Sequence, residues 1–180
     1  MKVFFDTEFT CLQKDTSLIS IGLVSENGKI FYAEATDYDR SQVNEWIQKN
    51  VIENLYFNKG HNIIPTENYF SGTKKEIKMR LKKWLKQFDT VDLVSDVCHY
   101  DMLLFIDIFG TAWDLPKNVS PCCYDINQDI MRYYDYDTLE KAFDKSREEI
   151  LQEHELIVAG DKHNSLYDAR VIQAIYKMMK

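Results

Sequence analysis

The residues with the clearest chemical potential are acids near the two ends of the chain. Asp6 and Glu8 follow the apolar run Val3-Phe4-Phe5, and side chains two positions apart in a strand point to the same face. Two neighbouring carboxylates repel each other unless a cation joins them. The pair therefore predicts a divalent-cation site at the end of a buried strand. The alternative is a solvated strand end, because Asp-x-Glu is a common tripeptide.

A histidine and a further acid lie near the other end of the chain, at His163 and Asp168. The pattern places the histidine just before the last helix and the aspartate one turn inside that helix. Imidazole titrates near neutral pH and can accept a proton, whereas a carboxylate on a rigid helix can hold a cation. The alternative is an acid that only complements the helix dipole.

A fourth acid, Asp101, stands between the strand predicted at 91–97 and the helix predicted at 102–109. Alone, it could be only a helix N-cap. Asp96 is the alternative for this position. We favour Asp101, because an aromatic residue, Tyr100, precedes it and an apolar helix follows it directly.

These motifs resemble those of the DEDDh family of 3′-to-5′ exonucleases, which have the ribonuclease H-like fold. The resemblance rests on Asp6-x-Glu8, Tyr100-Asp101 and His163-x4-Asp168, and it spans residues 3 to 172. The short chain and the second motif are most similar to the small bacterial and phage exoribonucleases, including the mycobacterial-type and ribonuclease T groups. Proofreading members often carry two threonines after the first motif, whereas this chain has Phe9-Thr10-Cys11-Leu12, which argues against DNA proofreading.

The resemblance implies a role for each motif residue. Asp6 would bridge two divalent cations, either Mg²⁺ or Mn²⁺. Glu8 and Asp168 would bind the cation that holds the attacking water, and Asp101 would support the other cation. His163 would accept the proton of that water, and the product would be a nucleoside 5′-monophosphate. Two cations about 3.5–4 Å apart can stabilise both the attacking and the leaving oxygen of an in-line displacement.

Residues beside the acidic motifs are the candidates for contact with the 3′ end of single-stranded RNA or DNA. In the resembling family the segment after the first motif stacks on the last base and wedges it, and base–aromatic stacking is typically worth about 1–3 kcal/mol. Core packing or support of neighbouring residues is the alternative. The candidates are Phe9, Thr10, Leu12, His99 and Tyr100.

A predicted helix that opens at Thr73 carries seven basic residues and one acid between positions 74 and 86. The basic face is either solvated or a track that guides single-stranded nucleic acid to the site, and the resemblance allows such a track to run across a homodimer. The basic residues are Lys74, Lys75, Lys78, Arg80, Lys82, Lys83 and Lys86.

The elements that must position these residues alternate between strand and helix patterns. We expect an α/β, ribonuclease H-like fold with a central mixed five-stranded sheet and helices on both faces. Residues 53–72 read as an irregular loop, and Ser41 and Asp125 read as helix N-caps. Strands are predicted at 2–6, 18–24, 29–35, 91–97 and 121–124, and helices after Ser41, Thr73, Asp101, Asp125 and Asn164.

Composition limits the class of protein. With 45% apolar and 28% charged residues, we expect the 180 residues to form one domain, 1–180. None of their apolar runs is long enough to cross a membrane. No secretory signal is evident and four cysteines read as reduced thiols, so we expect a cytoplasmic protein. The net charge of −7 argues against non-specific coating of nucleic acid. Two rival functions remain: a related module that binds nucleic acid or a nucleotide without cutting it, and a ribonuclease H-type endonuclease.

Overall fold

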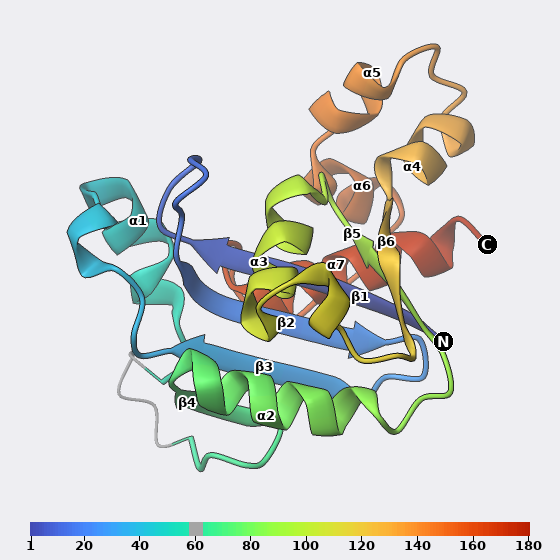
Figure 1. Ribbon diagram of the computed structural model, residues 1–180. Coiled ribbons are helices and arrows are strands. Elements are labelled where there is room, and N and C mark those ends of the chain that lie inside the picture. Colours follow the sequence, from blue (N-terminus) through green and yellow to red (C-terminus); the bar gives the residue numbers. More distant parts are fainter. Residues whose placement is uncertain (58–62) are drawn as a thin grey trace.

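The computed structural model describes residues 1–57 and 63–180, which form a mixed β-sheet with helices on both faces (Figure 1). The strands are β1 (Lys2–Phe9), β2 (Leu18–Ser25), β3 (Ile30–Ala35), β4 (Tyr69–Gly72), β5 (Val91–Ser95) and β6 (Val119–Asp125). They lie in the order β4-β3-β2-β1-β5-β6. The β1–β2 and β2–β3 pairings are antiparallel, and the other three are parallel.

Helices cover the two faces unequally. They are α1 (Glu45–Asn50), α2 (Lys74–Leu85), α3 (His99–Phe109), α4 (Asn127–Tyr133), α5 (Leu139–Asp144), α6 (Arg147–Glu153) and α7 (Ser165–Met178). In Figure 1, α2 and α3 lie in front of the sheet and α7 lies behind it. Helix α6 packs against α7, and α4 and α5 pack against each other. Within the described ranges, every helix lacks the length or the apolar character that a bilayer-spanning segment requires.

The alternation of side chains along β1 decides which face receives the acids. Phe5 is buried in the core beneath α2 and α3, whereas Phe4 is buried in the core beneath α7. Successive strand side chains point to opposite faces, so Asp6 and Glu8 lie on the same side as Phe4. Both carboxylates therefore face α7.

The start of α7 is held against the middle of the sheet by buried polar contacts. The hydroxyls of Ser20 on β2 and Ser165 on α7 lie 2.9 Å apart. Asn164 caps the helix: its Oδ1 accepts the backbone N–H of Leu166 at 3.2 Å, and its Nδ2 donates to the Tyr32 hydroxyl at 3.2 Å. Since Asn164 is fully buried, these bonds form away from water and hold the first turn of α7 in one position.

The predicted fold class is confirmed, but the predicted count of five strands was wrong. The described residues form six, because Tyr69–Gly72, within the predicted loop 53–72, pairs in parallel with β3. A strand of four residues has too short an alternation to stand out from a loop, so only its partner reveals it. A 3₁₀ turn, Ile52–Asn54, overlaps the start of the predicted loop. Residues 58–62 of that predicted loop lie outside the described residues.

Two helix caps also differ from the prediction. α1 begins after Asn44, whose Oδ1 accepts the N–H of Ile47 at 2.9 Å, whereas Ser41 lies in a preceding 3₁₀ turn. Asp125 is not the N-cap of α4: it accepts the backbone N–H of Asn127 at 2.9 Å, and α4 begins after Ile126. Asn and Ser are similar N-caps, so sequence alone could not choose between neighbouring positions.

The predicted start of α2 after Thr73 is confirmed. Thr73 and Glu76 form a reciprocal capping box at the start of α2. Gly110 follows α3 with a φ of 113°, a conformation that glycine adopts without a steric penalty. All four cysteines are free thiols; Cys122 is exposed, and the other three are partly buried.

Candidate active site

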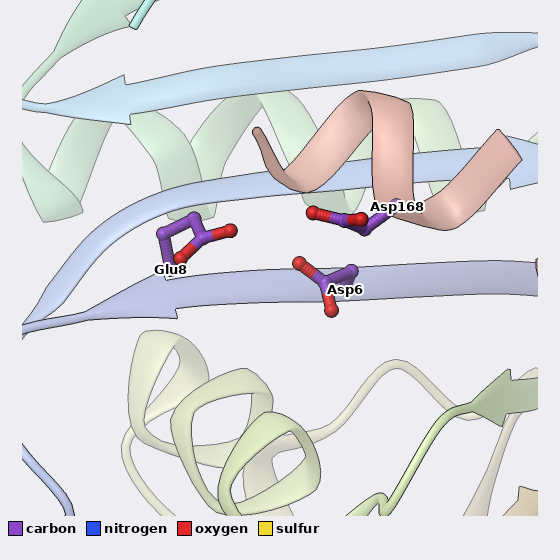
Figure 2. Close-up of side chains that lie close together, drawn as sticks. All are labelled: Asp6, Glu8 and Asp168. Atoms are coloured by element: carbon purple, nitrogen blue, oxygen red, sulfur yellow. The ribbon is translucent and has the colours of Figure 1, made fainter. Parts of the chain in front are cut away.

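Three carboxylates converge where β1 passes beneath α7. One oxygen from each of Asp6, Glu8 and Asp168 lies within 4.8 Å of the other two. Figure 2 shows the two side chains of β1 and the side chain of α7 directed into the same space. Carboxylate oxygens are the ligands that Mg²⁺ and Mn²⁺ prefer, so the donor set and its spacing fit a divalent cation.

The electrostatics of this acidic cluster favour a bound cation. Burial, followed by the charges of Asp101, Asp168 and Glu8, raises the pKa of Asp6 well above its usual value. Burial and the charges of Asp168 and Asp101 likewise raise the pKa of Glu8. The pKa of Asp168 is raised to about 7, mainly by burial. Without a cation, the cluster therefore resists full ionisation at neutral pH.

Asp101 lies beside the cluster and is held by hydrogen bonds. Its side chain is 5% exposed. Its Oδ1 accepts the backbone N–H of Thr7 at 3.0 Å and the Thr7 hydroxyl at 2.6 Å, and its Oδ2 accepts the Ser95 hydroxyl. Burial raises its pKa to about 6, while these hydrogen bonds act in the opposite direction. Asp101 is not one of the three acids whose oxygens converge. Its charge nevertheless acts on Asp6 and raises the pKa of that residue.

Asp96, the alternative to Asp101, has a different environment. Arg147 of α6 donates from Nε and Nη2 to its two carboxylate oxygens, at 2.6 and 2.7 Å. Asn127 donates from Nδ2 to the same carboxylate at 2.8 Å. Of the two candidates, Asp101 raises the pKa of Asp6 more strongly. We therefore retain Asp101 for the role beside the cluster.

His163 precedes the cap of α7 with a left-handed φ of 61°. Its ring packs edge-on against Trp46 of α1, with centroids 5.1 Å apart. Burial and the neighbouring Lys162 lower the pKa of His163, whereas Glu148 raises it. A lowered pKa keeps the imidazole neutral and able to accept a proton at physiological pH.

Two hollows meet at the acidic cluster. The carboxylate hollow, of about 380 Å³, is lined by the three clustered acids and His163, among others. The aromatic hollow, of about 420 Å³, is lined by Phe9, Leu12 and Trp46. Glu8 and His163 line both hollows, so the two spaces adjoin at the cluster.

The predicted substrate-contact residues divide into two groups. Phe9, Thr10 and Leu12 line the aromatic hollow. Leu12 is 75% exposed, whereas Thr10 is fully buried and its hydroxyl accepts the backbone N–H of Ser17 at 2.9 Å. Tyr100 stacks on Phe9, with ring centroids 5.2 Å apart and an interplanar angle of 22°. His99 is exposed and lines neither hollow.

Sequence reasoning missed the role of Trp46. Its spacing with Val43 and Ile47 reads as the apolar face of a helix, yet the indole is 53% exposed and lines the aromatic hollow. The signal that could have indicated Trp46 is its large apolar side chain in the first turn of a short helix, α1. Phe143 and Lys162, which line the carboxylate hollow, were also missed.

The basic helix α2 lies on the sheet face opposite the acidic cluster. Several of its cations have partners within the chain: Lys74 pairs with Asp107 at 2.7 Å, Lys78 donates to the carbonyl of Phe109 at 2.6 Å, and the Arg80 guanidinium lies over the Phe70 ring. These contacts favour the interpretation of α2 as a solvated face rather than a track to the site.

The sequence matches a known family along almost its whole length. A family model described as the 3'-5' exoribonuclease Rv2179c-like domain matches residues 1–179. Two curated relatives from Mycobacterium tuberculosis are the 3'-5' exoribonuclease Rv2179c of strain H37Rv and the 3'-5' exoribonuclease MT2234.1 of strain CDC 1551. Each is 28% identical over 121 residues, which cover 66% of this chain and 67% of the relative.

Solved structures share the fold at low identity. A 3'-exonuclease studied for 3'-end specific recognition of the histone mRNA stem-loop superposes with a TM-score of 0.66 and 12% identity, covering 99% of this chain and 63% of that one. A full-length 3'-exonuclease superposes with a TM-score of 0.63 and 14% identity, covering 99% of this chain and 59% of that one. The Mg²⁺- and Mn²⁺-bound form of S. pombe Pop2p superposes with a TM-score of 0.60 and 17% identity, covering 99% of this chain and 82% of that one.

This chain thus spans less than two thirds of the first two solved exonucleases. The superpositions confirm the ribonuclease H-like fold. The sequence match, which extends over residues 1–179, carries the assignment of the activity. The chain belongs to the Rv2179c-like family of 3'-5' exoribonuclease domains, and it is an enzyme of that class.

Proposed function

We propose that the chain, acting as a single domain of residues 1–180, removes nucleotides one at a time from the 3′ end of single-stranded RNA and releases nucleoside 5′-monophosphates. The observation that carries this proposal is the convergence of Asp6, Glu8 and Asp168 at the junction of two hollows. A strand end can occupy one hollow while the rest of the strand leaves through the other. Single-stranded DNA is the second candidate substrate.

The acidic cluster would hold the cations. Asp6, Glu8 and Asp168 offer converging oxygens, and Asp101 supplies further negative charge beside Asp6. Two Mg²⁺ or Mn²⁺ ions, when bound, would supply charge stabilisation for the attacking and leaving oxygens. The raised pKa values of the metal-free acids support this assignment, because a cation removes the cause of their mutual repulsion.

His163 is the proposed general base. It lines both hollows and therefore borders the place where the scissile phosphate would lie. Its lowered pKa favours the neutral imidazole, which can take the proton of the attacking water. Contact with Trp46 and the Asn164 cap would restrict the orientation of the ring.

The aromatic hollow is the proposed place of the last nucleoside. Phe9, Leu12 and Trp46 offer apolar side chains for the faces and edge of a base. Tyr100 supports Phe9 by stacking behind it. For His99 no substrate contact is proposed, since it lines neither hollow.

One experiment separates this function from its rivals. Single-stranded RNA and DNA carrying a 5′ label are incubated with the protein and Mn²⁺, and the products are sized; Asp6→Asn serves as the inactive control. A ladder that shortens from the 3′ end supports the proposal. Internal fragments would support the endonuclease, and intact strands would support the module that binds without cutting. We also propose a homodimer and a cytoplasmic location; light scattering tests the first, and cell fractionation tests the second.

A further inference from the structure

Two exposed apolar side chains line the carboxylate hollow together with the clustered acids. Phe143 of α5 lines it, and this side chain is 58% exposed. Val97, with 37% exposure, lines the same space. Exposed apolar side chains that line a hollow beside carboxylates indicate a binding surface rather than a core.

The position of this surface relative to the acidic cluster suggests its ligand. This inference rests on the proposed function, in which the last nucleoside occupies the aromatic hollow and the scissile phosphate lies at the cluster. Because the two hollows adjoin at Glu8 and His163, the next nucleoside must lie on the other side of that phosphate. The carboxylate hollow of about 380 Å³ is the space available there.

The end of helix α5, which carries Phe143, is fixed by hydrogen bonds from Arg147. Arg147 donates to the carbonyls of Ala142 and Lys145, at 3.0 and 2.6 Å, on either side of the end of α5. The same guanidinium donates to Asp96 at the end of β5, and its side chain is only 13% exposed. Ala142 is fully buried. A preorganised surface loses little conformational entropy when a ligand binds to it.

The charge of the hollow also suits a nucleic acid strand. Lys162 lines it and pairs with Glu148 at 3.0 Å, and the two side chains are 56% and 45% exposed. Exposed ion pairs contribute little stability, so Lys162 can exchange this partner for a phosphate. Lys145 differs, because it pairs with Glu153 and lies over the Tyr134 ring.

We propose that Phe143 forms a second base-binding subsite, in which its ring stacks on the base of the second-last nucleotide. The subsite recognises any base by its face, since stacking depends little on base identity. It would hold the strand on the leaving side of the scissile phosphate while the last nucleotide is removed.

A pair of tetraribonucleotides tests this subsite. One carries four bases, and the other is abasic at the second-last position only. Release of the last nucleotide is measured for wild type, Phe143→Ala, Phe143→Tyr and Leu139→Ala. Leu139 is the matched control, because it lies on the same helix, is 49% exposed and does not line the hollow. Melting temperatures check that the variants remain folded.

The proposal predicts that wild type prefers the complete substrate to the abasic one by at least about fivefold in kcat/KM, mostly through KM. Phe143→Ala should lose this preference by cutting the complete substrate more slowly, while it cuts the abasic one like wild type. Phe143→Tyr and Leu139→Ala should keep the preference. Equal preference in wild type and Phe143→Ala would overturn the subsite alone. Wild type that releases no 3′ nucleotide from either substrate would overturn the proposed function as well.

Discussion

Gly22 on β2 lies directly beneath the backbone of Leu166 in the first turn of α7. A Cβ atom at Gly22 would lie 2.4 Å from the Leu166 N and Cα atoms. Gly22 is also the partner of Asp6 in the β1–β2 register. The missing side chain thus lets α7 approach the sheet closely enough for Asp168 to reach the acids of β1.

Gly22→Ala should therefore separate the two halves of the acidic cluster. Backbone atoms cannot rotate away, so α7 must shift, and overpacking of this kind typically costs about 1–3 kcal/mol. A displacement of roughly 1 Å can lower turnover by about 100-fold. Thermal unfolding and single-turnover cleavage measure the two effects.

Ser20→Ala is the matched control for this substitution. It removes the hydrogen bond to Ser165 but adds no atoms between β2 and α7. It should cost about 1 kcal/mol of stability and keep most of the activity. If Gly22→Ala cleaved RNA as fast as wild type, close packing at this point would not position Asp168.

Asp6→Asn and Asp168→Asn should each abolish turnover while the protein remains folded. Each replacement removes a negative charge from a cluster of acids that repel one another. The melting temperature in metal-free buffer should consequently stay level or rise. Calorimetric titration with Mn²⁺ should show weakened binding; undiminished cleavage at saturating Mn²⁺ would contradict the metal-ligand assignment.

His163→Ala should lower the cleavage rate by about 10²–10⁴-fold, the usual contribution of a general base. Metal binding should change little, because the clustered acids remain. The fall in rate at acidic pH should become flatter, since the group that must be neutral is gone. Loss of Mn²⁺ binding in calorimetry would instead make His163 a ligand.

The metal-free protein should lose stability as pH rises. The folded-state pKa values of Asp101 and Asp168 are raised to about 6 and about 7, above the value of about 3.9 for an unfolded aspartate. Their contribution to stability is therefore fully present below about pH 4 and is lost as pH rises through 6 and 7.

Melting temperatures between pH 4.5 and 8 in the presence of a chelator test this dependence. In a protein of this size, a loss of about 1 kcal/mol lowers Tm by about 2–4 °C. Asp168→Asn should weaken the dependence on pH, and added Mn²⁺ should raise Tm most at the alkaline end. A Tm that rises steadily from pH 5 to pH 8 without metal would contradict the raised pKa values.

The sequence predicted the parts of the site that depend on local pattern. The alternation of β1 placed Asp6 and Glu8 on one face, and helix signals placed His163 just before α7 and Asp168 in its first turn. It could not predict the contact of Gly22 with Leu166, because that contact joins positions 144 residues apart and a glycine carries no sign of its partner. The place of Trp46 in the aromatic hollow and the strand β4 were not predicted for the same reason, because each depends on residues distant in the sequence that pack beside it.

We propose that Asp6, Glu8 and Asp168 hold the cations at which RNA is cut. An anomalous difference map at the manganese edge tests it most directly, with crystals grown in Mn²⁺ and a nucleoside 5′-monophosphate. We expect manganese peaks in contact with carboxylates of both β1 and α7. A map with no manganese between these three side chains, from crystals that bind manganese elsewhere, would contradict it.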